Sequence, residues 1–171
     1  MGSHEEDSQV ARRLRSGLVE TSLYDIAERY IGTKEIPGFE GNPAILAMLT
    51  LDNRWPENDE VPWCSAFINY CAWLLRLPRS KSLMARSWLG VGTAITDAGA
   101  QRGDVVILWR GSRGGDAGHV GLFSGWDAWD LNGSVPDHQG NVHLLGGNQG
   151  DSVSVDSFER DRVVGIRRLT R

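Results

Sequence analysis

The chain has 171 residues, enough to bury the core of one domain without disulfides or metal ions. Its 18 Lys and Arg against 22 Asp and Glu give a net charge of −4, so electrostatics does not favour nucleic acid or an anionic membrane as a partner. The sequence contains no apolar stretch long enough for a membrane span or a signal peptide. We therefore expect a protein that is made in the cytoplasm and does not insert into membranes.

The N-terminal segment is predicted to lie outside the folded domain. Met1-Gly2-Ser3-His4 resembles the scar of an expression tag, and polar residues follow to about residue 17. We therefore divide the chain into a polar extension over residues 1–17 and a single domain over residues 18–171. No internal repeat or low-complexity tract suggests a second domain.

Helical periodicity characterises the first half of the domain. Ser22 and Asp25 are spaced as a capping box, and Gly32 is a stop signal for the helix that they begin. Pro43 suits the first turn of a second helix. The predicted helices are residues 23–31, 42–49, 64–75 and 82–89.

Short β-branched runs separated by Gly, Asp and Ser characterise the second half. The predicted strands are residues 104–109, 119–123, 142–145, 153–155 and 163–166. Helices followed by strands indicate an α+β fold, in which N-terminal helices pack on a C-terminal, largely antiparallel sheet.

Cys64 is the candidate nucleophile, because it begins the third predicted helix directly after Pro62-Trp63. The unpaired N–H groups of a first helical turn favour a thiolate, and we expect the sulfur to reach the surface. The alternative is a small buried residue that opens a core helix. Cys71 lies seven positions later on the same helix, about 10.5 Å away at a rise of about 1.5 Å per residue, so the two cannot form a disulfide within it.

His119 is the candidate base. It begins a strand after a glycine-rich loop, where a side chain can be held rigidly and still meet solvent. His138 and His143 are weaker candidates, and their spacing from the cysteines fits no compact zinc site. The acidic residues 52–60 lack the spacing of a calcium loop, so we expect no metal and no cofactor.

Several motifs together resemble one family of enzymes. The chain carries, in order, IGTKEIPG, NPAIL, VPWCSAFINYCAWLL, LMARSWLGVG, RGDVVIL, GHVGLFSG, LLGGNQGDSVSV and VVGIRR. Over roughly residues 22–169 this series resembles the papain-like cysteine amidohydrolases of the CHAP and NlpC type, in particular a bacterial and phage subgroup. By position, the resemblance assigns the nucleophile to Cys64, the base to His119 and the residue that orients the base to Asn148. Gly146 stands where many CHAP domains have a glutamate, so the role of that acid does not carry over.

The choice of Asn148 over Gln149 depends on strand alternation. If residues 142–148 form a regular strand beside the one that begins at His119, the two amides point to opposite faces and only one meets the imidazole. We expect that one to be Asn148. The backbone N–H of Cys64 is the expected oxyanion donor. The remaining candidates, for a second donor or for a substrate groove, are Glu35, Asn58, Trp63, Trp88 and Gln149, of which Glu35 and Trp88 are equally interpretable as structural.

The resemblance implies hydrolysis of peptidoglycan through a thioester acyl-enzyme. The bond would be either the N-acetylmuramoyl-L-alanine amide or an amide within the stem peptide. Single-domain enzymes of this type occur as phage lysins, prophage products and antibacterial effectors, which another machine delivers to the cell wall. We expect a monomer whose partner is peptidoglycan, joined by an immunity or delivery protein if it is an effector. The alternatives are acyl transfer to an amine, a non-catalytic wall-binding module and, weakest, a redox role for the cysteines.

Overall fold

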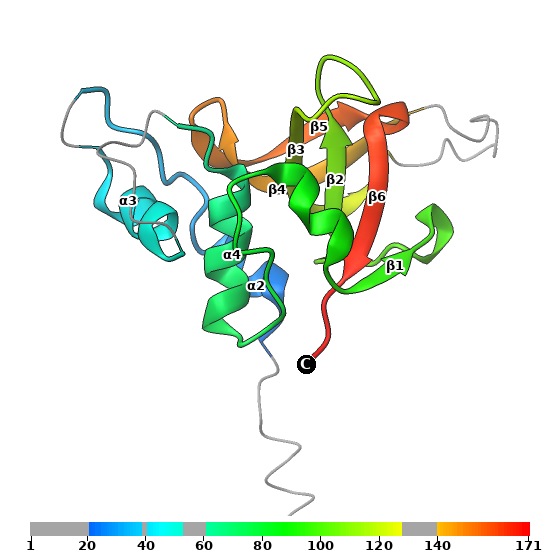
Figure 1. The fold of residues 1–171 in the computed structure, drawn as a ribbon, viewed down its shortest axis with the longest axis horizontal. Coiled ribbons are helices and arrows are strands. Elements are labelled where there is room, and N and C mark those ends of the chain that lie inside the picture. Colours follow the sequence, from blue (N-terminus) through cyan, green and yellow to red (C-terminus); the bar gives the residue numbers. More distant parts are fainter. Residues whose placement is uncertain (1–20, 39–40, 53–60, 128–139) are drawn as a thin grey trace, which may run out of the picture.

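The computed structural model describes residues 21–38, 41–52, 61–127 and 140–171. These form an α+β fold with one six-stranded sheet, in which the strand order is β1-β6-β2-β3-β4-β5 and every neighbouring pair is antiparallel (Figure 1). The predicted fold class is therefore confirmed at this level. The predicted extension, residues 1–17, lies outside the described residues.

The predicted helices and strands occur in the predicted order, and three short elements were not predicted. These are the strand β1, before the buried strand β2, and the 3-10 helices η2 and η3. The elements are α2 (Leu23–Glu28), α3 (Pro43–Thr50), α4 (Cys64–Leu74), η1 (Ala85–Gly90), β1 (Thr93–Ile95), η2 (Asp97–Gly99), β2 (Val105–Trp109), β3 (Gly118–Trp126), β4 (Asn141–Gln149), β5 (Ser152–Glu159), η3 (Arg160–Arg162) and β6 (Val163–Arg168).

The starts of the first two helices are fixed by local side-chain caps. The hydroxyl of Ser22 accepts the Asp25 N–H at 3.1 Å, and the Asp25 carboxylate accepts the Ser22 N–H at 2.8 Å, which confirms the predicted capping box. Helix α2 ends at Glu28, earlier than predicted, because the following turn leads Gly32 to donate its N–H to the Val153 carbonyl of β5 at 2.9 Å. Asn42 caps α3 with Pro43 in the first turn.

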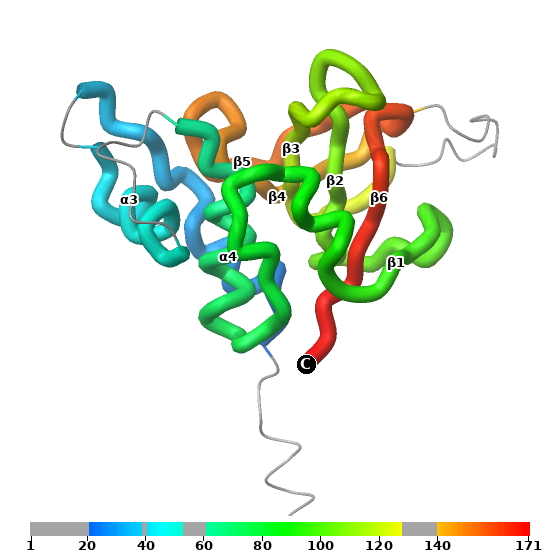
Figure 2. The backbone as a smooth tube through the Cα atoms, viewed as in Figure 1, coloured from blue at the N-terminus to red at the C-terminus, as the bar shows by residue number. Residues whose placement is uncertain are grey.

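Helix α4 connects the helical layer to the sheet. It packs on α2 and α3 and on the strands β3 and β4, so that it lies between α3 and the sheet (Figure 2). Its buried face includes Phe67, Ile68 and Cys71, which have no exposed surface. Helix α4 is thus held in place mainly by apolar burial, and each large buried side chain stabilises the folded state by about 1.5–3 kcal/mol.

The sheet is buried on both of its faces. Along β2, Val105 and Ile107 belong to the core shared with the helices, whereas Val106 and Leu108 belong to a second apolar cluster on the opposite face. Successive strand residues point to opposite faces of a sheet. Because both faces are buried at β2, the strand is hydrophobic at every position. Among the described residues, no helix is long and apolar enough to cross a membrane.

Candidate active site

Cys64 is the first residue of α4, as predicted, but its side chain is only 5% exposed. The expectation that the sulfur reaches the surface is therefore wrong, because β3 packs against the beginning of the helix. The backbone N–H of Val120 is directed to the sulfur. Burial raises the pKa of the Cys64 thiol, and the Val120 N–H and the charge of Arg110 oppose that rise. The unpaired first turn of α4 alone does not make this thiol acidic.

The strand pairing explains why the backbone N–H of Val120 is available to donate a hydrogen bond to the Cys64 sulfur. Strand β3 pairs with β2 over Gly118–Leu122 and with β4 over Leu122–Trp126. Val120 thus precedes the part of β3 that pairs with β4. Beside Val120, the N-terminus of α4 takes the position that β4 has further along β3. A backbone donor that the sheet leaves available becomes a hydrogen-bond donor to a thiol or a thiolate.

His119 lies in β3 and has no exposed surface. The prediction that its ring still meets solvent is wrong, because the ring packs on Phe158 with the centroids 5.2 Å apart. Nε2 lies 2.9 Å from Oε1 of Gln149, and Nδ1 lies 3.4 Å from Nη2 of Arg110. Both ring nitrogens therefore have a partner.

The partners of Gln149 determine which nitrogen of His119 carries the proton. The Gln149 amide nitrogen faces three acceptors, namely the Leu144 carbonyl at 3.2 Å and the carbonyl and hydroxyl oxygens of Ser154 at 2.8 and 3.2 Å. Its oxygen must then point to His119 and accept a hydrogen bond from Nε2–H. A neutral imidazole protonated at Nε2 has its lone pair on Nδ1, so the basic nitrogen is the one beside Arg110.

Asn148 does not contact His119, and the prediction that it orients the ring is corrected in favour of Gln149. The register between β4 and β5 shifts between Gly146 and Gln149, and Asn148 has a left-handed φ of 57°. This bulge reverses the alternation on which the prediction relied, so Gln149 faces His119. The Asn148 amide instead points to Glu35 Oε1 at 3.4 Å and to the Val61 carbonyl at 3.5 Å.

Burial also decides the protonation state of His119. It lowers the pKa of the imidazole from 6.5 to about 4, an effect that the Gln149 hydrogen bond and Asp156 counteract and that Arg110 and Arg162 reinforce. Among the contacts of the described residues, no hydrogen bond joins the Cys64 sulfur to this ring. The resting pair is a neutral thiol beside a neutral imidazole, which differs from the thiolate expected at the beginning of a helix.

The depressed pKa of His119 predicts an acid-dependent loss of stability. The unfolded chain takes up a proton near pH 6.5 and the folded protein only near pH 4, so the contribution of His119 is complete above pH 6.5 and is lost as the pH falls through 4. The full loss corresponds to about 3 kcal/mol. Glutamine does not titrate, so the difference in unfolding free energy between wild type and His119→Gln, measured by urea denaturation, should shrink by about 3 kcal/mol as the pH falls from 6.5 to about 4. Two parallel pH profiles would contradict it.

Trp63 and Trp88 belong to the core and do not line a groove. Both have no exposed surface, so their predicted contact with substrate is wrong. The Trp88 indole N–H donates to the Ser65 hydroxyl at 2.9 Å, and that hydroxyl donates to the Ser82 carbonyl at 2.6 Å. For Trp88, the structural interpretation therefore holds, because its ring ties the first turn of α4 to η1.

Glu35 is half-buried and ties its loop to the beginning of α4. Its Oε1 accepts the Trp63 indole N–H at 2.6 Å as well as the longer contact from Asn148. Gln149 is 5% exposed and is engaged with His119, so a direct substrate contact, as predicted, does not fit its position. Asn58, the candidate for a second oxyanion donor, lies outside the described residues.

Arg110 is the site residue that the sequence analysis missed. It directly follows β2, and its N–H donates to the Ala117 carbonyl at 3.0 Å across the hairpin to β3. The signal was present, because two predicted strands joined by a short glycine-rich loop form a hairpin, and the first residue after one strand then lies beside the beginning of the next.

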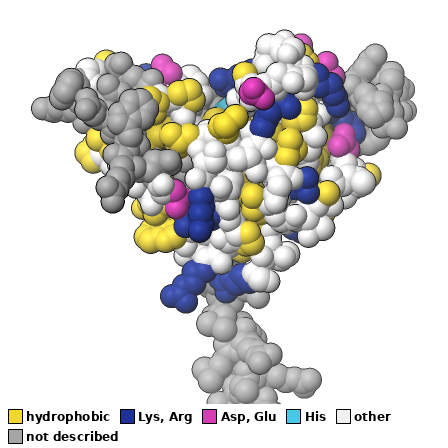
Figure 3. All heavy atoms as spheres, viewed as in Figure 1, with side chains coloured by type: hydrophobic (Ala, Val, Ile, Leu, Met, Phe, Trp, Pro, Cys, Tyr) yellow, Lys and Arg dark blue, Asp and Glu magenta, His cyan; other side chains and the backbone are white. Residues whose placement is uncertain are grey.

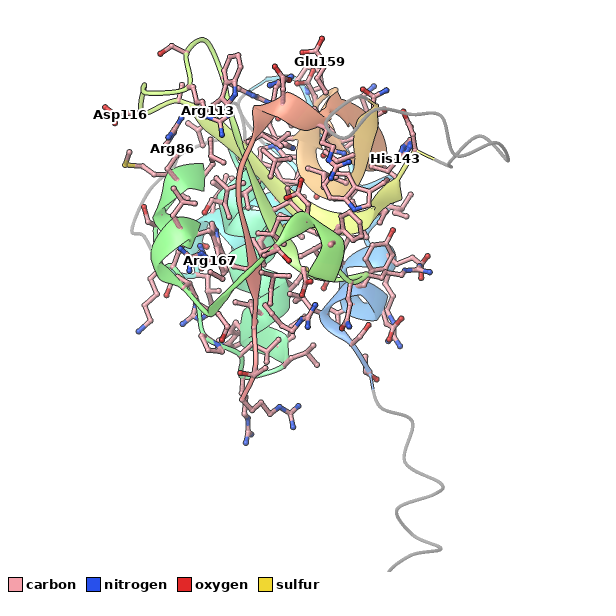
Figure 4. All side chains as sticks on the ribbon, turned by 90° about the vertical axis from the view of Figure 1, so that its right-hand side faces the viewer. Arg86, Arg113, Asp116, His143, Glu159 and Arg167 are labelled. Carbon is pink, nitrogen blue, oxygen red and sulfur yellow. The ribbon has the colours of Figure 1, made fainter. Side chains whose placement is uncertain are left out.

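The other histidine among the described residues lies away from this hairpin. His143 pairs with Asp127 at 2.8 Å, and Figure 4 shows it on the opposite side of the view from Arg86, Arg113 and Asp116, which surround the hairpin. No group of three His, Cys, Asp or Glu side chains that could hold a metal occurs within the described residues. His138 and most of the acidic loop, residues 53–60, lie outside that part of the chain.

No protein-family model matches the chain, and comparison with curated proteins gave no match either. The function that follows therefore depends on the arrangement of Cys64, His119 and Gln149 and on the motifs that surround them.

Proposed function

We propose that the protein is a papain-like cysteine amidohydrolase that cleaves an amide bond of bacterial peptidoglycan, in or next to the stem peptide. The observation that carries this proposal is the convergence of three groups. The Cys64 sulfur lies at the N-terminus of α4, the Val120 N–H faces it, and the preceding residue, His119, is oriented by Gln149. A nucleophile, a neighbouring base and a group that orients the base are the parts that cysteine-dependent acyl transfer requires.

The chemistry that these groups support has two steps. The Cys64 sulfur, after losing its proton, attacks the amide carbonyl, and the backbone N–H of Cys64 stabilises the resulting oxyanion. The C–N bond then breaks, the leaving amine takes up a proton, and a thioester remains on Cys64. Water attacks the thioester and releases the acid and the thiol. His119 is suited to transfer the protons because Nε2–H is held by Gln149 and the lone pair is left on Nδ1.

Two arguments favour an enzyme over a non-catalytic wall-binding module. The side chain of His119 is completely buried, and a buried titratable group on a strand costs stability at acidic pH without contributing a binding surface. Its ring nitrogens are nevertheless held by Gln149 and Arg110 in one tautomer, beside the residue that contacts the sulfur. Such an arrangement suits proton transfer better than adhesion to a polymer.

Mass spectrometry of purified peptidoglycan after digestion tests this proposal. Cleavage at the muramoyl amide leaves stem peptides with a free N-terminal alanine, whereas cleavage within the stem leaves shortened muropeptides. Repeating the digestion with an added primary amine distinguishes hydrolysis from acyl transfer, because transfer adds the mass of the amine to the new carboxyl end. Digests identical to those of heat-inactivated protein, for peptidoglycans of several cross-link types, would contradict the proposal.

A further inference from the structure

Arg110 brings a permanent positive charge to a buried site. The residue as a whole is exposed at the end of β2, yet its Nη2 lies 3.4 Å from Nδ1 of the fully buried His119. The residue after His119 is Val120, whose N–H faces the Cys64 sulfur. The guanidinium therefore lies at the one ring nitrogen that Gln149 leaves available, on the side of the hairpin next to the thiol.

The neighbouring arginines are engaged elsewhere. Arg86 donates to the Arg113 carbonyl at 2.8 Å, Arg113 to the Asp161 carbonyl at 3.0 Å, and Arg162 to the Trp109 carbonyl at 3.3 Å. These bonds hold the β2–β3 hairpin to η1 and η3, and Figure 3 shows the basic side chains on that end of the molecule. Arg110 forms no ion pair with a carboxylate of the described residues.

A guanidinium that contacts an imidazole near a thiol, and that has no carboxylate partner among the described residues, favours a negative charge on the thiol over a positive charge on the imidazole. Arginine stays protonated at every physiological pH, so a second positive charge on His119 would be repelled, whereas a negative charge on Cys64 would be attracted. We propose that Arg110, and not a protonated His119, is the counter-ion of the Cys64 thiolate. This inference depends on the proposed role of Cys64 as a nucleophile.

The ionisation can be written without a proton on the imidazole. Cys64–SH gives Cys64–S⁻ and a proton that is released to water, while His119 stays neutral with its Nε2–H on Gln149. The sulfur is then stabilised by the Val120 N–H and the charge of Arg110, which oppose the effect of burial on the pKa of this thiol together with the backbone N–H groups of Ser65 and Cys64. When the thiolate forms in this way, the leaving amine takes its proton from solvent, and Nδ1 of the neutral His119 is left to accept a proton from the water that attacks the thioester.

The other charged groups around the site act differently. Arg162 of η3 and Asp156 of β5 affect the imidazole with opposite signs. Glu35 accepts the indole N–H of Trp63, the residue before α4. The positive charge directed at both Cys64 and His119 comes from Arg110.

The pH dependence of Cys64 ionisation tests this assignment without any substrate. The rate of Cys64 alkylation by iodoacetamide is measured as a function of pH by peptide mass spectrometry, and thiolate absorbance near 240 nm is titrated against a Cys64→Ser blank. Arg110→Gln is expected to raise the midpoint by on the order of one pH unit, which slows alkylation at a fixed lower pH about tenfold. Arg110→Lys should keep the midpoint close to that of wild type, because lysine retains the positive charge. Arg162→Gln is the matched control and should leave the midpoint unchanged.

His119→Gln decides between the two possible counter-ions. If Arg110 balances the thiolate, removing the imidazole leaves the midpoint near that of wild type. A midpoint that rises in His119→Gln and stays unchanged in Arg110→Gln would overturn the proposal in favour of an imidazolium. A midpoint equally unchanged in both variants would also overturn it. Because neither measurement requires peptidoglycan, a failure here is distinct from a failure of the proposed hydrolysis.

Discussion

Cys64→Ser is expected to reduce the turnover of peptidoglycan hydrolysis by a factor on the order of 10⁴ or more, because a hydroxyl at this position has no hydrogen bond to the base and is a far weaker nucleophile than sulfur. Serine is a sharper test than alanine at this position. The sulfur is buried and faces the Val120 N–H, which a serine oxygen can still engage, whereas alanine would leave that donor unsatisfied at a cost of about 1–3 kcal/mol. Muropeptide release, followed by mass spectrometry, is the measurement.

Cys71→Ala is the matched control for this experiment. Cys71 lies on the same helix, has no exposed surface and has a pKa that burial raises, so it has no route to a substrate. Its replacement should lower the free energy of unfolding by about 1–2 kcal/mol and leave the specific activity of the folded protein unchanged. Activity that survives in Cys64→Ser would remove Cys64 from the mechanism, and activity that disappears in a folded Cys71→Ala variant would contradict the purely structural role of Cys71.

The elements of the fold were predictable from local patterns, and their exact lengths were not. The capping box at Ser22 and the proline in the first turn of α3 are local signals, and both helices begin where they indicate. Strands β3 and β4 extend beyond their apolar cores because pairing with neighbouring strands continues into residues of any type. β1 was missed because its three residues are mostly exposed and owe their strand conformation to pairing with β6.

The sequence located the two candidate residues Cys64 and His119 at the beginning of a helix and of a strand, but it mispredicted their surroundings. Their burial depends on how α4 packs on β3, a tertiary contact that no local pattern encodes. The same holds for Trp63 and Trp88, since a tryptophan beside a reactive residue suits a core as well as a groove.

The error at Asn148 had a visible signal in the sequence. Gly146-Gly147-Asn148 are residue types that favour bulges and left-handed backbone, and one extra residue in a strand reverses the direction of every side chain that follows. Gly147 also lies so close to the ring of Trp63 and the Cβ of Phe67 that a side chain there would collide with both. The glycines thus allow β4 to approach the helix, and the bulge then directs Gln149 to His119.

The second large expected effect comes from replacing Gln149, with Asn148 as its comparison. Gln149→Ala removes the only acceptor for His119 Nε2–H seen among the described residues, so we expect turnover to fall by about ten- to a thousandfold. Asn148→Gly should reduce turnover far less, because the hydrogen bonds of its side chain among the described residues are the long ones of 3.4 and 3.5 Å to Glu35 and Val61. Glycine is the appropriate replacement at this position, since it accepts the left-handed φ without strain. Circular dichroism of both variants checks that they fold.

The acid limb of the pH–rate profile separates an orienting role from a merely structural one. His119 must be neutral to accept a proton from the water that attacks the thioester, so the rate of this second step is lost as the pH falls through the pKa of His119, about 4. The Gln149 hydrogen bond raises that pKa, so Gln149→Ala should move the acid limb to lower pH, while Gln149→Glu, which puts a carboxylate at the imidazole, should move it to higher pH. Asn148→Gly should leave the limb where it is in wild type. If Asn148→Gly moves the limb and the Gln149 variants do not, the orienting amide belongs to Asn148 and the arrangement at the β4 bulge does not describe the active enzyme.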